Sequence, residues 1–156
     1  VASAGVGGLD VALLDERERA VLATVDEVVV DATTVRTADA VDPFIDHWYL
    51  DAVRLGGFTP PPPEGVERGE LRELVRRGHL VSRDGVYFHP DTIDAAAAIA
   101  AQLLRQSPGG FTVAEFRDAT AASRKFVLPL VAELDGRGVT RRRDDVRIAG
   151  PRLPQI

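Results

Sequence analysis

Lys125 is the only lysine among the nineteen basic residues of this 156-residue chain, and it directly follows Arg124 at the predicted start of a helix. In a chain that otherwise uses arginine, one lysine suggests that an ammonium group is required there. A second basic cluster, Arg141 to Arg143, follows in a predicted β-hairpin. Ammonium and guanidinium groups gathered on one surface bind phosphate groups, so these residues predict binding to a polyanion, most plainly a nucleic acid.

The charge of the chain is unevenly distributed. The formal net charge is −5, but residues 1–90 hold nine arginines against sixteen carboxylates, whereas residues 91–156 hold ten basic against eight acidic side chains. This distribution argues against indiscriminate binding of nucleic acid and indicates a positive surface in the C-terminal part.

We predict no catalytic residue and no metal ligand. The chain has no cysteine, its three histidines are far apart, and no nucleophile lies in a pattern with a base, so we expect no enzyme. No apolar run is long enough to span a bilayer and no signal peptide is recognisable, so we expect a cytoplasmic protein. The absence of Met at position 1 suggests part of a longer protein.

An internal repeat organises the chain. The tetrapeptide at 56–59, Gly-Gly-Phe-Thr, recurs at 109–112. Further matches lie at a constant offset of sixty: Glu73-Leu74 with Glu133-Leu134, Arg77-Gly78 with Arg137-Gly138, Arg83-Asp84 with Arg143-Asp144, and Val86 with Val146. Two tandem copies of one unit follow from these matches.

The second copy begins with two predicted helices. Asp91 is the predicted N-cap of a helix over 92–106, which ends at a Ser-Pro-Gly-Gly break. After a short β segment, Thr112 and Glu115 have the spacing of a capping box, and Phe111 and Phe116 have that of a hydrophobic staple, so a short helix is predicted over 113–119.

A third helix and a hairpin complete the second copy. Ser123 or Thr120 is expected to cap the third helix, in which Pro129 interrupts the backbone hydrogen bonding. One face of that helix is apolar, and Lys125 lies nearly opposite to it: the apolar residues are Phe126, Val127, Leu130, Val131 and Leu134. Residues 139–142 and 146–149 are predicted to form the hairpin.

Three helices followed by a hairpin form the winged-helix variant of the helix-turn-helix. We therefore predict a mainly helical α+β fold of tandem winged-helix modules with small two-stranded wings. The predicted divisions are a connector or remnant of a preceding winged helix (1–40), a scaffold or spacer module (41–90) and a binding module (91–150). In 1–40, Glu16 to Thr24 suggests a helix end, and Val28–Val30 with Thr34–Thr37 suggests a hairpin.

The start of the third helix and the wing are expected to project from one side of the binding module. The predicted binding residues are Ser123, Arg124, Lys125, Arg141, Arg142, Arg143, Asp144 and Arg147. The first copy has the same predicted elements, with helices over 44–55 and 67–77, a turn at 63–66, and strands over 79–83 and 86–89. It has Glu64-Gly65 and Val81-Ser82 at the positions equivalent to the basic pairs, which is why we predict a scaffold there.

The second copy resembles a known family. Gly110-Phe111-Thr112-Val113-Ala114-Glu115-Phe116-Arg117-Asp118, Ser123-Arg124-Lys125-Phe126, Arg137-Gly138-Val139-Thr140-Arg141-Arg142 and Asp145-Val146-Arg147 are similar to the last winged helix of the bacterial selenocysteine-specific elongation factor, SelB. Ala121-Ala122 stands where that family usually has Gly-Thr. The resemblance implies binding of the selenocysteine insertion (SECIS) hairpin in mRNA, which directs recoding of UGA.

The resemblance also implies the partners of the longer factor. These are the ribosome and selenocysteinyl-tRNA, with GTP and Mg bound by an N-terminal GTPase domain that this chain lacks, so no cofactor is expected here. We expect a monomer that does not contact a membrane. The alternative is a DNA-binding winged-helix transcription regulator, which would usually need a dimer or a second basic module to cover two half-sites. A pure protein-interaction module would leave Arg124 and Lys125 dispensable.

Overall fold

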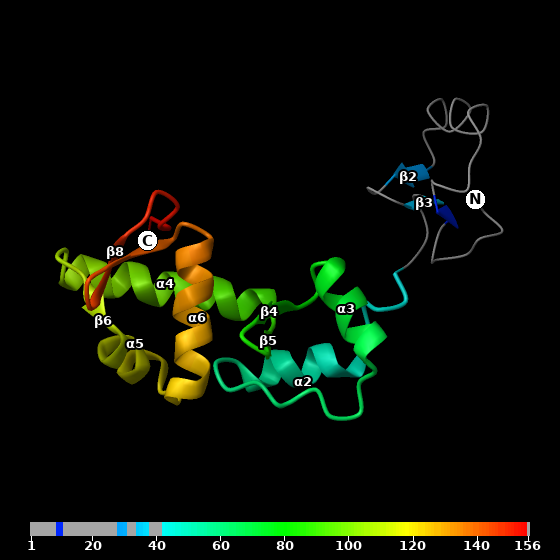
Figure 1. Cartoon of the computed structure of the whole chain (residues 1–156), viewed down its shortest axis with the longest axis horizontal. Coiled ribbons are helices and arrows are strands. Elements are labelled where there is room, and N and C mark those ends of the chain that lie inside the picture. The colour runs from blue at the N-terminus through cyan, green and yellow to red at the C-terminus, as the bar shows by residue number, and fades with distance from the viewer. Residues whose placement is uncertain (1–8, 11–27, 31–33, 38–41, 156) are drawn as a thin grey trace. The chain divides into compact units, whose positions relative to one another are not determined.

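The computed structural model describes residues 9–10, 28–30, 34–37 and 42–155 of the chain. These residues belong to two compact units, Val1–Asp46 and His47–Ile156, and most of their elements are labelled in Figure 1. Within the described residues, no helix has the length and the apolar character that crossing a bilayer would require.

The first unit contains a small antiparallel sheet. Its strands are β1 (Leu9–Asp10), β2 (Val28–Val30) and β3 (Thr34–Thr37), in the order β1-β3-β2. Val29 pairs with Arg36 in the centre of the β2–β3 hairpin, so the hairpin predicted for this segment is confirmed. The predicted helix end between Glu16 and Thr24 lies outside the described residues.

The second unit begins with a helix that starts later than its sequence suggests. Helix α2 (Trp48–Gly56) begins four residues after the predicted start at residue 44. His47 is its N-cap, with Nδ1 accepting from the backbone N–H of Tyr49 at 3.2 Å. The Tyr49 hydroxyl donates to the carbonyl of Pro61 at 2.9 Å, which anchors the proline-rich loop that follows the helix.

The rest of the first module matches the predicted order. Helix α3 (Arg68–Arg76) is followed by β4 (Val81–Arg83) and β5 (Val86–Phe88), which pair as an antiparallel hairpin. Its two-residue turn, Asp84-Gly85, has positive φ at both positions, 49° and 79°, and this requirement suits the Asp-Gly sequence.

Helix α4 (Pro90–Gln106) opens the second module, and its predicted N-cap is wrong. The N-cap is His89, whose Nδ1 accepts from the backbone N–H of Asp91 at 3.2 Å, while Pro90 takes the first helical position. Proline suits that position because its missing N–H would have no intrahelical partner there. Asp91 instead contributes a negative charge to the first turn.

Helix α5 (Val113–Thr120) confirms the predicted capping box. The backbone N–H of Thr112 donates to Glu115 Oε2 at 2.7 Å, and the backbone N–H of Glu115 donates to Thr112 Oγ1 at 3.2 Å. The rings of Phe111 and Phe116 stack with their centroids 5.6 Å apart, as the staple predicted.

A strained residue separates α5 from the third helix. Ala121 adopts the left-handed conformation, φ 53° and ψ 22°, at the C-cap of α5. A residue with a Cβ is disfavoured there, and glycine would fit without strain. Helix α6 (Arg124–Gly136) follows, with Ser123 as its N-cap and Pro129 inside it.

The wing of the second module has one strand more than predicted. Strands β7 (Thr140–Arg143) and β8 (Val146–Ala149) form the expected hairpin, and β6 (Phe111–Thr112) pairs with the other edge of β8. Gly110, at φ 125°, permits this approach, because a Cβ there would lie 2.9 Å from the carbonyl oxygen of Arg147. The predicted mainly helical α+β fold of winged-helix type is confirmed.

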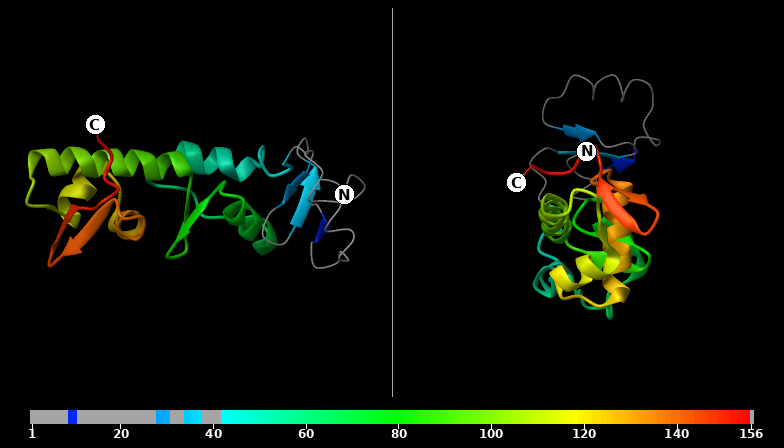
Figure 2. Two further views of the ribbon diagram at one scale, coloured as in Figure 1. Left: turned by 90° about the horizontal axis from the view of Figure 1, so that it is seen from above. Right: turned by 90° about the vertical axis from the view of Figure 1, so that its left-hand side faces the viewer.

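The core of the second unit is shared between its two modules. In the view from above, α5, α6 and the β7–β8 hairpin lie on one side of α4 (Figure 2). Phe88 of β5 is fully buried in the same cluster as the apolar residues of α4, α5 and α6, and Val81 and Val86 pack against that cluster. The Arg83 Nη1 of β4 also lies 3.9 Å from Glu133 Oε2 of α6. The two hairpin-bearing modules are therefore packed together as one body.

Candidate nucleic-acid interface

The first turn of α6 presents two cations at the positive end of the helix dipole. Arg124 and Lys125 are both exposed, and the first turn contains no acidic residue. The other helices that the structure describes each have one carboxylate in the first turn, namely Asp51, Glu70, Asp91 and Glu115. Cations at a helix N-terminus are unfavourable for helix stability, and an anion bound there would offset that cost.

The N-cap of α6 satisfies only some of the backbone donors at the start of this helix. Ser123 has an extended backbone, and its side chain makes no capping hydrogen bond. Its carbonyl accepts from the backbone N–H groups of Phe126 and Val127 at 3.0 and 3.1 Å. The Lys125 ammonium lies 5.3 Å from the centroid of the Phe126 ring, a cation–π distance. Backbone amides and an ammonium group can thus contact the same phosphate.

The wing carries the other predicted cations. Arg141, Arg142 and Arg143 are exposed on β7, and side chains alternate between the faces of a strand, so Arg142 lies on the opposite face from its two neighbours. Arg142 Nε donates to the carbonyl oxygen of Asp144 at 3.1 Å. Asp144 forms the turn with φ 54°, so its backbone fixes the direction of the Arg142 side chain.

Arg147 is held by the protein instead of being presented to solvent. Its side chain is 13% exposed, and its Nε lies 3.3 Å from Asp135 Oδ2 of α6. The Thr140 hydroxyl donates to the other oxygen of the same carboxylate at 2.6 Å. This network makes Arg147 a residue that joins the wing to α6, and its contact with the ligand stays a prediction.

Sequence reasoning missed Arg117. A hollow of about 120 Å³ is lined by Val113, Ala114 and Arg117 of α5 and by Arg124 of α6. Arg117 is exposed and forms an ion pair with its neighbour Asp118 at 3.0 Å. The sequence signal that could have identified Arg117 is its spacing. It follows Val113 by four residues, so both side chains lie on one face of the short helix.

The β6–α5 junction links the start of α6 to the wing. Thr112 pairs with Val146, which directly follows the turn of the wing, and the next residue, Val113, lines the hollow with Arg124. Figure 1 shows α5 following β6 and leading to the first turn of α6. We use the term cationic surface for the six exposed basic residues of α5, the first turn of α6 and β7, of which Arg142 lies on the opposite face of β7 from Arg141 and Arg143: Arg117, Arg124, Lys125, Arg141, Arg142 and Arg143.

Carboxylates also border the cationic surface. Two hydrogen bonds from Thr112, first from its backbone N–H and then from its hydroxyl, lower the pKa of Glu115 below its usual value. Glu115 therefore stays ionised as part of the capping box. The described residues contain no group of three side chains placed to hold a metal ion.

The second module matches a known family model. Residues 102–149 match the model described as "Elongation factor SelB, winged helix". This match covers α5, α6 and the wing, and therefore all eight residues predicted from the sequence to bind. A comparison with curated protein sequences gives no match.

Two solved structures are similar to the chain. The mRNA-binding domain of elongation factor SelB from Escherichia coli, in complex with SECIS RNA, matches with 26% identity and a TM-score of 0.50 over 53% of this chain and 69% of that chain. The bacterial selenocysteine-specific elongation factor EF-Sec matches with 13% identity and a TM-score of 0.57 over 91% of this chain. The present chain spans only about a quarter of EF-Sec, as the match covers 26% of it. The resemblance inferred from the sequence is confirmed by these matches.

Proposed function

We propose that this chain, whose residues 102–149 are a winged helix of the SelB type, is the C-terminal mRNA-binding region of a selenocysteine-specific elongation factor. Its ligand is a SECIS hairpin in mRNA, as in the complex of the Escherichia coli SelB domain. The observation that supports this function most directly is the first turn of α6. It places Arg124 and Lys125 where they oppose the helix dipole and where an anion would offset that cost.

The cationic surface suits the tip of an RNA hairpin. A regular RNA duplex hides its base edges in a deep, narrow groove, whereas a hairpin loop offers unpaired bases beside closely spaced phosphates. Lys125 and the open amides of α6 bind phosphate, and planar guanidinium groups such as Arg124 and Arg142 fork toward or stack on an unpaired base. The hollow beside Arg124, which Val113, Ala114 and Arg117 also line, offers space next to these groups.

The remaining partners belong to the longer factor in this proposal. Binding of the hairpin would hold the ribosome-bound factor and its selenocysteinyl-tRNA near a UGA codon. GTP and Mg would be bound by a GTPase domain elsewhere in that factor, and the present chain would contribute recognition without catalysis. Translation places this activity in the cytoplasm.

A competition experiment tests the proposal against DNA binding. The full chain is titrated with a fluorescent SECIS-type RNA hairpin, and the complex is challenged with unlabelled hairpin or with duplex DNA of equal charge. We expect the hairpin to displace the probe at a concentration about a hundredfold or more below that of DNA, because specific recognition exceeds backbone attraction by large factors. Equal competition by DNA would refute the RNA-binding function.

A further inference from the structure

The first module has a basic surface of its own that the sequence comparison of the two copies does not reveal. Helix α3 carries Arg68, Arg72 and Arg76 at successive intervals of four, which places them along one face of the helix. Glu70 lies on the other side, whereas Glu73 lies beside Arg76 and pairs with it. Arg68 and Arg72 therefore form the basic part of this face, although the module as a whole is acidic.

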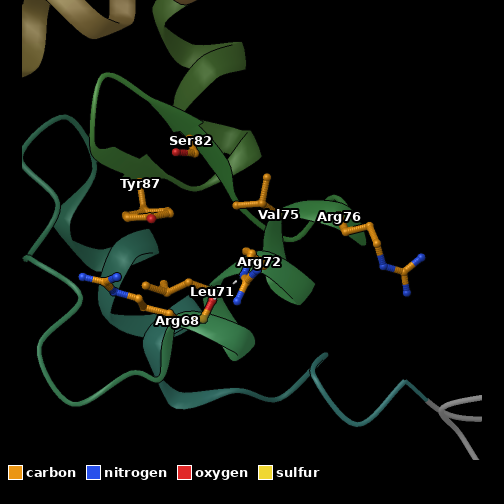
Figure 3. A pocket seen from close by; sticks show the side chains of 7 residues that line it. All are labelled: Arg68, Leu71, Arg72, Val75, Arg76, Ser82 and Tyr87. Atoms are coloured by element: carbon orange, nitrogen blue, oxygen red, sulfur yellow. Dashed lines mark hydrogen bonds between the residues drawn. The ribbon is translucent and has the colours of Figure 1, made fainter.

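The basic face of α3 borders a hollow. The hollow has a volume of about 630 Å³, and its walls come from α3 and from both strands of the adjoining hairpin (Figure 3): Arg68, Leu71, Arg72, Val75, Arg76, Ser82 and Tyr87. Ser82 and Tyr87 are cross-strand partners, so their side chains project from the same face of the hairpin toward α3. The hollow thus combines guanidinium groups, two hydroxyls and an apolar floor.

Two of the three arginines are available to a ligand. Arg76 Nη2 is paired with Glu73 Oε2 at 3.0 Å, and Figure 3 shows its side chain extending away from the others. Arg68 and Arg72 are exposed, and neither forms an ion pair with the residues that the structure describes. Arg72 Nε contacts only the backbone carbonyl of Arg68, at a long 3.4 Å. The guanidinium groups of Arg68 and Arg72 are thus uncompensated charges on one helix face.

We propose that this hollow is a second RNA site, which binds the sugar–phosphate backbone of an RNA helix without reading its sequence. Arginine side chains four residues apart on a helix are close enough to contact neighbouring phosphates of one strand. The hydroxyls of Ser82 and Tyr87 can bond the ribose 2′-OH, and Leu71 and Val75 can pack against the ribose. The choice of RNA over DNA rests on the proposed function of the second module.

The two modules then divide RNA recognition between different parts of equivalent helices. In the second module the cations lie at the start of α6, whereas in the first they lie along the middle of α3. On this inference, the start of α6 contacts phosphates and bases of a hairpin loop, and the face of α3 contacts phosphates of an RNA stem. The first module is, on this inference, a second point of attachment to RNA in addition to a scaffold.

The test uses the full chain and an RNA duplex without a loop. Arg68→Gln with Arg72→Gln should weaken duplex binding about tenfold and reduce the slope of log affinity against log salt by about two, one for each lost phosphate contact. The matched control removes two exposed arginines elsewhere, Arg105→Gln with Arg152→Gln, and should leave duplex binding unchanged. Circular dichroism of each variant reports that the fold is intact.

The outcomes separate this inference from the proposed function. Discrimination between a SECIS-type hairpin and one with an altered loop should persist in the Arg68→Gln/Arg72→Gln variant and should be lost in Arg142→Ala. Duplex affinity equal in variant and wild type, or lowered equally in the control, would overturn the second site while leaving hairpin recognition intact. Displacement of the duplex by poly-glutamate at equal charge would also overturn it, because the hollow would then bind acidic peptides.

Discussion

Asp135 of α6 joins two strands of the wing through one carboxylate: Oδ2 accepts from Arg147 Nε at 3.3 Å, and Oδ1 accepts from the Thr140 hydroxyl at 2.6 Å. Both donors lie on the side of the sheet that faces α6, because Thr140 is buried and Arg147 is only 13% exposed. Charge-assisted hydrogen bonds therefore fix the wing against α6. Arg142, opposite Arg147 in the register, remains exposed for a ligand.

This arrangement predicts opposite behaviour for two neighbouring arginines. Arg147→Gln should lower the free energy of unfolding by about 1.5–3 kcal/mol. The substitution removes a charge-assisted hydrogen bond and leaves the partly buried carboxylate of Asp135 without its charged partner. Arg142→Ala should weaken hairpin binding by about 1–3 kcal/mol and change stability by less than about 0.5 kcal/mol. Urea denaturation and a binding titration of both variants provide the comparison. Equal stability losses in the two would contradict the assignment.

Lys125→Ala should separate binding from stability. We expect hairpin affinity to fall by about 1–3 kcal/mol with a salt slope smaller by about one. Thermal unfolding should be unchanged or shifted slightly upward, because a cation is removed from a helix N-terminus. Arg152→Ala, an exposed cation of the C-terminal tail, is the control and should keep wild-type affinity. An unaltered titration of Lys125→Ala across salt concentrations would rule out its role.

Arg117 and Asp118 should have opposite effects on RNA binding. Arg117 lines the hollow beside Arg124 and is partly neutralised by its ion pair with Asp118. Arg117→Gln should therefore weaken hairpin binding by about 1 kcal/mol, and Asp118→Asn should strengthen it by about 0.5 kcal/mol at low salt. Both effects should shrink as salt rises. If the two changes acted in the same direction, Arg117 would lie outside the interface.

Replacing Ala121 by glycine should stabilise the second module. The left-handed backbone at φ 53° costs an alanine about 1 kcal/mol, and glycine avoids that cost. Ala119→Gly, an exposed position within α5, is the control and should destabilise by about 0.5–1 kcal/mol. Denaturation midpoints of the two variants should move in opposite directions. A destabilised Ala121→Gly variant would show that the turn is not strained in solution.

The cap of α4 should make stability fall in mild acid. Burial, as the largest cause, lowers the pKa of His89 below its usual 6.5, while nearby Asp91 opposes the shift and Arg54 supports it. A lowered pKa in the folded state means that the unfolded chain takes up a proton first. The His89 contribution is therefore complete above pH 6.5 and is lost as the pH falls from there through the lowered value.

The geometry of His89 gives the same sign. In the neutral ring, Nδ1 accepts from the backbone N–H of Asp91 at 3.2 Å, and Nε2 lies 3.2 Å from the guanidinium of Arg54. Protonation of Nδ1 would remove the capping hydrogen bond and place a positive ring beside that guanidinium. His89→Asn keeps a capping side chain without a titratable group, so its unfolding free energy should vary less between pH 7.5 and 5. His79→Asn is the control. If the unfolding free energy of His89→Asn fell with pH as steeply as that of the wild type, His89 would be excluded as the source of the pH dependence.

Local signals predicted most of the elements, and tertiary contacts account for what was missed. The Thr112–Glu115 capping box involves neighbours in the chain, so spacing alone revealed it. The pairing of β6 with β8 joins residues far apart in sequence, and it depends on the close backbone approach at Gly110. The N-cap of α4 was misplaced because His89 is seldom favoured as a cap, whereas Asp91 is a residue type that often is.

The candidate site could be predicted only in part, because some of its side chains are positioned by tertiary contacts. The exposed cations of β7 and of the α6 first turn follow from strand and helix periodicity. The inward position of Arg147 depends on Asp135, a contact that no short-range pattern encodes. Likewise, comparing the two copies position by position concealed Arg68 and Arg72, because they lie on α3 at places where α6 has no cation.

The burial of Phe88 has a mechanical consequence. This side chain belongs to the wing of the first module, yet it is fully buried in a cluster with apolar residues of the second module's helices, so swinging one module away would expose an aromatic ring to water. The cost of exposing this ring opposes separation of the two modules and holds the α3 hollow and the start of α6 in one packed unit. An RNA that contacts both sites would need a stem of matching length.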